Sequence, residues 1–351
     1  MTSKPLPEGD LLQVLREAGG AWERFRGQRL FITGATGFFG RWLLESLLSA
    51  DSTYGLELRI VALSRDPSPF LAAHPHLAVG PKLTWTRGSV STLGPASLEG
   101  RRFDQVIHLA TEADLEATRS DPAAAIQVIA DGTRNALEVA VEAGARRFLF
   151  TSTGSVYGNL PPGSASFDEG MELPRTPSPA CDALAIGAEA KRRAELHCAE
   201  AAHRGKLEVV IARCFSFAGP GMPMEGKFAF GNFMRDALAG RTIVLTGDGS
   251  PVRSYLYGSD LTVWLLGLLS QGSPGSAYNV GSEQAVTLRE LAETIAHELG
   301  APGVEVRAQP VPGGSINRYI PSTEKARSEL GLRETTGLVQ AIRKTADWLR
   351  H

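Results

Sequence analysis

The segment Arg29–Gly40 reads RLFITGATGFFG and decides the fold. Its first five residues form a short apolar run that ends at a glycine, which predicts a buried strand. Gly34, Gly37 and Gly40 follow. Helical spacing over Arg41–Ala50 then predicts a helix. In this context glycines allow a tight turn, a close backbone approach to a pyrophosphate and close helix-on-strand packing, while the helix N-terminus adds amide donors. The alternative is a glycine turn that binds no ligand.

Strands and helices alternate over the rest of the first 214 residues. Apolar runs predict further strands at 58–63, 83–86, 105–109, 147–152 and 208–212, and helical spacing predicts helices at 123–143 and 183–204. This alternation predicts the α/β class with a Rossmann-type, doubly wound parallel sheet. The segment 159–180 is rich in proline and serine, which predicts a loop.

The pattern loosens beyond residue 214. Short strands are predicted at 242–245, 277–280 and 304–307, and helices at 260–269, 287–299, 322–330 and 337–349. We therefore expect three parts. They are a lead-in over 1–27 with a helix at Asp10–Phe25, a nucleotide-binding domain over 28–214, and a smaller α/β substrate lobe mainly over 215–351, from which some segments return to the nucleotide-binding domain.

Composition excludes several classes of function. The chain has 351 residues, 43% of them hydrophobic, and a net charge of −2, which argues against a uniformly basic surface for nucleic acid. Three isolated cysteines exclude a disulfide scaffold and a paired-cysteine metal site, and they favour a reducing, cytoplasmic compartment. The apolar run at 263–269 is too short to cross a membrane, and residues 1–10 lack the core of a signal peptide. These features argue against nucleic acid and membrane as partners.

The second predicted strand ends at Ser64-Arg65. Dinucleotide folds usually carry an acidic residue here, which binds the ribose hydroxyls. A serine–arginine pair suits the 2′-phosphate of NADP instead. Arg65 could also lie over the adenine, with Ser64 or Asp66 serving the ribose, or be a solvated surface residue. The residues thus leave NAD and NADP open.

Eight motifs in chain order resemble the extended short-chain dehydrogenase/reductases, and specifically the NAD-dependent epimerase/dehydratase family of sugar-nucleotide enzymes. They are TGATGFFG at 33–40, VIHLA at 106–110, TSTGSVYG at 151–158, KRRAE at 191–195, IARCFSFAGP at 211–220, GDGSPVRSYLYGSD at 247–260, YNVGS at 278–282, and the segment 318–330. The resemblance covers about 28–349. It implies NAD as cofactor, a nucleotide-linked or nucleoside sugar as substrate, and a homodimer formed through the helices at 123–143 and 183–204.

The resemblance also assigns residues. It implies cofactor contacts at Gly34, Thr36, Gly37, Phe38, Phe39, Gly40, Ser64, Arg65, Ser89, Val90, Leu109, Ala110, Thr111, Lys191 and Phe215. It implies substrate contacts at Glu112, Thr153, Gly154, Ser216, Asn232, Arg253 and Arg318.

The family's chemistry is a reversible hydride transfer. A tyrosine takes the proton of a sugar hydroxyl while NAD takes the hydride, a serine or threonine orients the oxygen, and a lysine lowers the tyrosine pKa and holds the nicotinamide ribose. The ketone acidifies the neighbouring C–H bond, so epimerisation or loss of water becomes feasible before the hydride returns. Thr153 and Lys191 match the threonine and lysine positions.

The tyrosine itself is missing. It should stand four residues before Lys191, where the sequence has Gly187, and no tyrosine occurs between Gly158 and Ser254. Gly154 and Ser155 also replace the two acidic residues of the family's 4,6-dehydratases.

The absence of the tyrosine leaves three interpretations open. Another acid/base, Glu112 or, with less support, Asp182 or Cys181, could move the proton, because a carboxylate in a dry cleft has a raised pKa. Water or a substrate hydroxyl could fill the space. The protein could also bind nucleotide without turnover. Tyr157 is expected in a structural turn, and His108 in the core.

We therefore expect an NAD-dependent sugar epimerase or dehydratase. The alternatives are an atypical sugar or nucleoside dehydratase that forms an alkene, an NADP-dependent ketone reductase, and a non-catalytic nucleotide-binding protein.

Overall fold

The computed structural model describes residues 4–78, 80–98, 100–111, 115–174, 183–226, 228–309 and 316–350. The chain divides into two compact units. The first comprises Met1–Gly158, Glu172–Cys214 and Thr262–Tyr278, and the second comprises Asn159–Met171, Phe215–Leu261 and Asn279–His351. No helix in these described ranges is long and apolar enough to cross a membrane.

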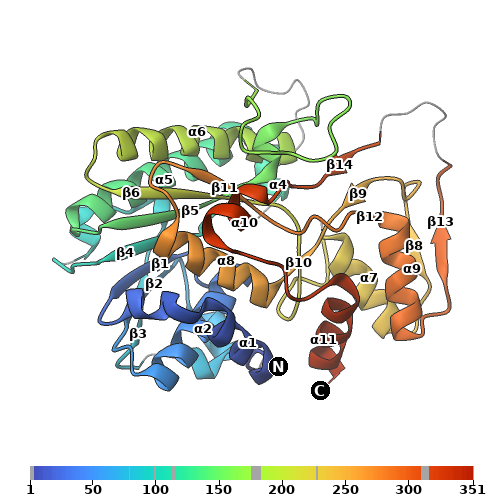
Figure 1. Ribbon diagram of the computed structural model, residues 1–351, viewed down its shortest axis with the longest axis horizontal. Coiled ribbons are helices and arrows are strands. Elements are labelled where there is room, and N and C mark those ends of the chain that lie inside the picture. The colour runs from blue at the N-terminus through green and yellow to red at the C-terminus, as the bar shows by residue number, and fades with distance from the viewer. Residues whose placement is uncertain are drawn as a thin grey trace. The chain divides into compact units, whose positions relative to one another are not determined.

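A seven-stranded sheet forms the centre of the first unit (Figure 1). In spatial order its strands are β11 (Ala277–Val280), β6 (Glu208–Cys214), β5 (Arg147–Thr153), β4 (Gln105–His108), β1 (Arg29–Thr33), β2 (Arg59–Ser64) and β3 (Leu83–Arg87). From β3 to β6 every neighbouring pair is parallel. Chain order reverses at β1, since β2 lies on one side and β4 on the other. This confirms the predicted doubly wound fold class.

One strand lies elsewhere than expected. The strand at 277–280 was predicted for the C-terminal lobe, but β11 is the edge strand of the large sheet. The two residues that precede β11 already bond to β6. Gly275 N donates to Val209 O at 2.7 Å, and Ile211 N donates to Ser276 O at 3.0 Å. Its short sequence does not reveal which sheet it joins, because pairing is a tertiary property.

Helices of the first unit cover both faces of the sheet, and Figure 1 shows α2 on one face with α6 on the other. They are α1 (Glu8–Ala18), α2 (Phe38–Tyr54), α3 (Ser68–Ala73), α4 (Leu115–Ser120), α5 (Pro122–Glu142) and α6 (Ala183–His203), with short 3₁₀ turns at Pro75–Leu77, Val90–Thr92, Pro95–Leu98 and Gly154–Tyr157. The single helix predicted at Asp10–Phe25 is wrong. Gly19 has a φ of +46°, which ends α1, and a 3₁₀ helix continues over Gly19–Phe25.

The lead-in segment is fixed to α2 by a buried ion pair. Arg41 Nε donates to Glu45 Oε1 at 2.8 Å, and both side chains are almost fully buried. Leu6 N donates to Glu45 Oε2 at 2.6 Å, and Arg41 Nη2 donates to Lys4 O at 2.5 Å. The carboxylate and the guanidinium therefore bind the backbone of the segment that precedes α1.

The second unit consists of short strands and of helices that connect them. Its elements are β7 (Phe217–Ala218), α7 (Ala229–Leu238), β8 (Ile243–Leu245), β9 (Val252–Arg253), β10 (Leu256–Tyr257), the start of α8 (Gly258–Gln271), β12 (Val286–Thr287), α9 (Leu288–Leu299), β13 (Val304–Val306), β14 (Arg318–Tyr319), α10 (Glu324–Leu330) and α11 (Leu338–Arg350). The strands form small sheets, β10-β7, β12-β9-β14 and β13-β8. The four predicted C-terminal helices are confirmed as α8 to α11. Helix α9 has a capping box in which Thr287 and Glu290 bind each other's backbone amides.

Candidate active site

The glycine-rich loop brings the ends of β1 and β4 into contact. Gly34 has a φ of +68°, and a Cβ atom there would lie only 2.6 Å from Ala110 N. The Thr33 hydroxyl accepts a hydrogen bond from Ala110 N at 3.3 Å, and Leu109 N donates to Thr33 O at 3.2 Å. Glycine is required at 34 both by the left-handed backbone and by the neighbouring strand end.

Gly40 has a different neighbour from the one expected. The sequence suggests that this glycine lets the helix pack on the strand. In the structure a Cβ atom at 40 would lie 2.4 Å from Ala35 O, so Gly40 makes room for the loop's own backbone. The loop therefore folds tightly against the first turn of α2.

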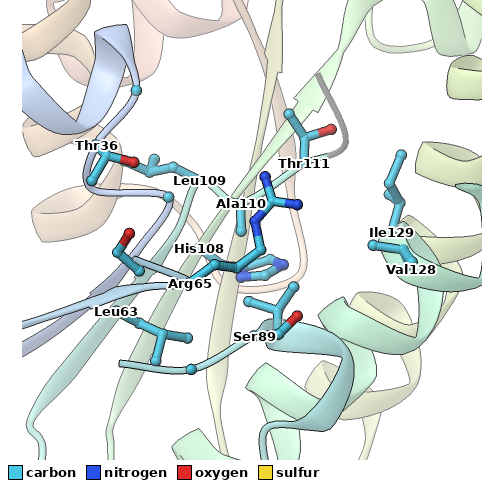
Figure 2. A pocket seen from close by; sticks show the side chains of 15 residues that line it. Thr36, Leu63, Arg65, Ser89, His108, Leu109, Ala110, Thr111, Val128 and Ile129 are labelled. Carbon is cyan, nitrogen blue, oxygen red and sulfur yellow. The ribbon is translucent and has the colours of Figure 1, made fainter. Parts of the chain in front are cut away.

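A pocket opens at the carboxyl ends of β1, β2 and β4 (Figure 2). It is lined by Gly34, Thr36, Gly37, Leu63, Ser64, Arg65, Gly88, Ser89, Val90, His108, Leu109, Ala110, Thr111, Val128 and Ile129. This position, where strand order reverses, is the usual ligand site of open α/β sheets.

Most of the residues assigned to the cofactor line this pocket, and several do not. Phe38, Phe39, Gly40, Lys191 and Phe215 are not among the lining residues. The ring of Phe38 instead lies 6.0 Å from that of Phe39 and 6.4 Å from that of Trp42.

Sequence reasoning missed Leu63, Gly88, His108, Val128 and Ile129 as lining residues. Leu63 and Gly88 adjoin assigned residues at the ends of β2 and β3, so strand ends could have pointed to them. Val128 and Ile129 come from α5, and no local motif marks them.

Arg65 is the cation of this pocket. Figure 2 shows its side chain reaching into the pocket from the end of β2. The neighbouring acid, Asp66, is engaged elsewhere: it accepts from Arg87 Nη2 at 2.8 Å and from Ser68 N at 3.1 Å. None of the described lining residues is Asp or Glu.

His108 is held in the core by two threonines. Its Nδ1 lies 2.7 Å from the Thr33 hydroxyl and its Nε2 lies 3.2 Å from the Thr133 hydroxyl. Burial lowers the pKa of His108 to about 3, and the positive charge of Lys191 adds to this. His108 therefore stays neutral at physiological pH, as expected of a core histidine that also borders the pocket.

Lys191 is buried in α6, with only 7% of its surface exposed. Its Nζ donates to Thr151 O at 2.8 Å and lies 4.7 Å from the centre of the Phe150 ring. Burial lowers the pKa of Lys191 from 10.5 to about 8. The predicted lysine therefore lies against the end of β5, the strand that carries Thr153.

Thr153 ends β5 and caps the following turn. Its hydroxyl accepts a hydrogen bond from Ser155 N at 3.2 Å, and its predicted contact with a substrate stays a prediction. The turn Gly154–Tyr157 follows, and Tyr157 is buried with its hydroxyl accepting from Arg213 Nη1 at 3.0 Å. Tyr157 is thus part of a structural turn, as expected.

A buried charged network fixes α6 against the sheet. Arg213 on β6 donates through Nη2 to Glu195 Oε2 on α6 at 2.7 Å, and Ser152 Oγ on β5 donates to Glu195 Oε1 at 2.6 Å. Glu195 lies one turn after Lys191 on the same helix. The network therefore sets the register of the helix that carries the lysine.

The residues assigned to the substrate in the second unit lie on separate elements. Arg253 on β9 and Arg318 on β14 come from paired neighbouring strands, and the Arg253 guanidinium lies 5.8 Å from the centre of the Tyr319 ring. Arg253 Nη1 donates to Asn317 O at 3.1 Å. The backbone of Ser216 accepts from Leu256 N at 3.0 Å, and Asn232 Nδ2 donates to Gly226 O at 2.8 Å.

The aromatic side chain of Phe215 packs within the second unit. Its ring lies 4.6 Å from that of Tyr319 and 6.1 Å from that of Phe167. Only 8% of the residue is exposed.

Comparison with known proteins agrees with this geometry. The family model described as NAD dependent epimerase/dehydratase family matches residues 30–281. A dTDP-glucose 4,6-dehydratase of Streptomyces antibioticus is 28% identical over 324 residues, 92% of each chain. UDP-glucuronic acid decarboxylase 6 of Arabidopsis thaliana is 29% identical over 86% of this chain and 83% of its own. A dTDP-glucose 4,6-dehydratase structure from Streptomyces venezuelae, with NAD bound, superposes with a TM-score of 0.76 at 26% identity, covering 92% of this chain and 97% of that one.

The chain belongs to the NAD-dependent epimerase/dehydratase family. This confirms the resemblance drawn from the motifs. The family model's match spans the glycine loop, the Thr153 turn and the Lys191 helix, and it ends at Gly281 within the YNVGS segment.

Gly187, predicted to stand at the family's tyrosine position, borders space that the described residues leave open. Gly187 lies inside α6, and a Cβ atom built there meets no heavy atom of the described structure within 4 Å. Glu112, Cys181 and Asp182, the predicted substitutes, lie outside the described residues.

Two helical glycines give a matched test of packing. Gly40→Ala should lower the free energy of unfolding by about 1–3 kcal/mol, because the added methyl group meets the Ala35 backbone. Gly187→Ala should raise it by about 0.5–1 kcal/mol, because alanine is the better helix former and the space is open. Urea unfolding of both variants measures the difference. Equal effects in the two would contradict this account of the loop.

Proposed function

We propose that this protein binds NAD in the pocket of the first unit and uses it to oxidise a hydroxyl of a nucleotide-linked sugar transiently. The observation that carries the proposal is the pocket itself. It combines a glycine loop too close-packed for any Cβ at Gly34, the N-terminus of α2, and a lining of small and apolar side chains. These features fit a dinucleotide.

Different residues are proposed to bind different parts of the cofactor. Gly34, Gly37 and the first turn of α2 would bind the pyrophosphate, Ser64 and Arg65 the adenosine ribose, and Lys191 the nicotinamide ribose. When bound, NAD accepts a hydride from the sugar and later returns it. Thr153 would orient the reacting oxygen.

The substrate would be held by the second unit. Arg253 on β9 and Arg318 on β14 are each proposed to contact the diphosphate, for which a planar guanidinium is suited. Ser216 and Asn232 are proposed to contact the sugar nucleotide as well, with Gly154 and Glu112 near the sugar. The net reaction would be epimerisation or water loss, with no net consumption of NAD. Cys198 and Cys214 are free and buried, which is in keeping with a reducing, cytoplasmic location.

Turnover of sugar nucleotides tests this proposal. The purified protein, supplied with NAD, should convert dTDP-glucose, UDP-glucose or UDP-glucuronic acid without accumulating NADH, as followed by mass spectrometry and absorbance at 340 nm. Thr153→Ala and Lys191→Ala should each lower the rate by about 100-fold or more, whereas Lys206→Ala, an exposed lysine beyond α6, should not.

Two results would contradict it. Steady NADPH consumption with a ketone would indicate a reductase. NAD binding with no conversion of any of the three sugar nucleotides would favour a nucleotide-binding protein.

Arg65 offers a test of cofactor choice. Ser64 and Arg65, with Asp66 bound to Arg87, also suit the 2′-phosphate of NADP. Arg65→Ala should therefore weaken NADP binding about tenfold more than NAD binding, because a charge-assisted bond to phosphate is lost. Calorimetry of both dinucleotides measures this ratio. Arg59→Ala, at the opposite end of β2, is the control. An unchanged ratio would mean that Arg65 does not face the 2′ position.

Dimerisation through α5 and α6 is proposed as well. Leu184 and Leu196 on α6 are 64% and 65% exposed, an unusual position for two leucines on a surface helix. Light scattering should give twice the mass of one chain, and Leu196→Glu should shift the protein toward monomer. A monomeric wild-type protein would refute this.

A further inference from the structure

The missing tyrosine leaves a question about the proton of the substrate hydroxyl. The described hydroxyl and imidazole groups around Lys191 are bound within the protein. Ser152 Oγ donates to Glu195 at 2.6 Å, and the Tyr157 hydroxyl accepts from Arg213 at 3.0 Å. His108 is bonded through both ring nitrogens, and burial lowers its pKa to about 3. None of these three is suited to take a proton at neutral pH.

The remaining charged and thiol groups are also unsuited. Glu195 is paired with Arg213 through both carboxylate oxygens. Burial raises the pKa of Cys214 to about 12 and raises that of Cys198 well above its ordinary value, so both stay protonated thiols. Lys191 is the remaining titratable group among these described neighbours. Its amine faces Glu195 and Cys198 from α6, Cys214 from β6 and His108 from β4, and burial sets its pKa to about 8.

The space for a reacting oxygen lies on the same face of α6. Gly187 precedes Lys191 by four residues, so the two positions are neighbours on the helix surface, about 5–6 Å apart at Cβ. No described heavy atom outside the helix's own backbone lies within 4 Å of a Cβ built at Gly187, so the described residues leave this space open. Thr151 O accepts one N–H of the amine, which leaves the others, or a lone pair, for a substrate.

We propose that Lys191 carries the proton of the substrate hydroxyl, with the reacting oxygen in the space beside Gly187. This rests on the proposed function. The neutral amine takes the O–H proton and becomes an ammonium, while the C–H hydride passes to the nicotinamide dinucleotide and the carbon becomes a ketone. On return, the ammonium gives the proton back to the oxygen as the carbon regains a hydride. One residue thus takes the place of the family's tyrosine–lysine pair.

Direct titration tests the amine without any substrate. The chain has seven lysines, so protein labelled with ¹³C at lysine Cε gives few signals, and Lys191→Arg identifies the one that belongs to Lys191. With NAD present, this signal should titrate near pH 8. A Lys191 signal that does not titrate below pH 10 would overturn the proposal.

Substitution separates proton transfer from positive charge. Lys191→Arg keeps the charge but cannot become neutral, so it should lower kcat at least 100-fold while the Kd for NAD changes less than about threefold. The wild-type rate should rise with pH through about 8, because the neutral amine is the active form. Lys206→Arg is the matched control. A Lys191→Arg variant that keeps more than a tenth of the rate would overturn the proposal. Loss of turnover in Glu112→Gln or Asp182→Asn would then indicate that one of those carboxylates moves the proton.

Filling the open space tests the position of the oxygen. Gly187→Phe supplies a ring without a hydroxyl, so it should lower kcat at least 100-fold with unchanged NAD affinity. An unaffected rate would place the reacting oxygen elsewhere. These outcomes differ from failure of the proposed function, in which the wild-type protein itself would not convert any sugar nucleotide.

Discussion

The close approach of two strand ends organises the first unit. The chain leaves β1 at Gly34, where an added Cβ atom would lie 2.6 Å from Ala110 N, just beyond the end of β4. Because β2 lies on one side of β1 and β4 on the other, the connections leaving these strands diverge in opposite directions. The pocket occupies the gap between them. A side chain at 34 would push the strand ends apart and remove both the tight turn and the site.

A second constraint places the lysine. Glu195, Arg213 and Ser152 join α6 to β5 and β6 through bonds that are almost fully buried. Removing one partner of such a pair leaves an uncompensated charge, which typically costs about 3–5 kcal/mol. The network therefore fixes the helix firmly, and Lys191, one turn away, is buried against Thr151 as a result. The same burial that fixes the amine lowers its pKa toward neutrality.

The pocket and the proposed proton carrier lie on different elements of the first unit. The pocket is lined by residues at the ends of β1, β2 and β4, whereas Gly187 and Lys191 lie on α6. A shared scaffold with an altered proton carrier is consistent with how function is distributed on folds. The sheet determines where ligands lie, and a few side chains determine the chemistry.

The sequence by itself determined the fold class, the glycine loop and the family. These depend on local periodicity and on motifs whose spacing is fixed by adjacent residues, as in Arg29–Gly40. It also predicted that Gly187 stands where the family has a tyrosine. The tertiary structure alone decided that β11 joins the large sheet, that Gly40 faces Ala35, and that Val128 and Ile129 line the pocket. It alone showed that Lys191 is buried and that Asp66 is bound to Arg87. Such facts depend on contacts between residues far apart in the chain or on local backbone geometry, and no periodicity or motif records them.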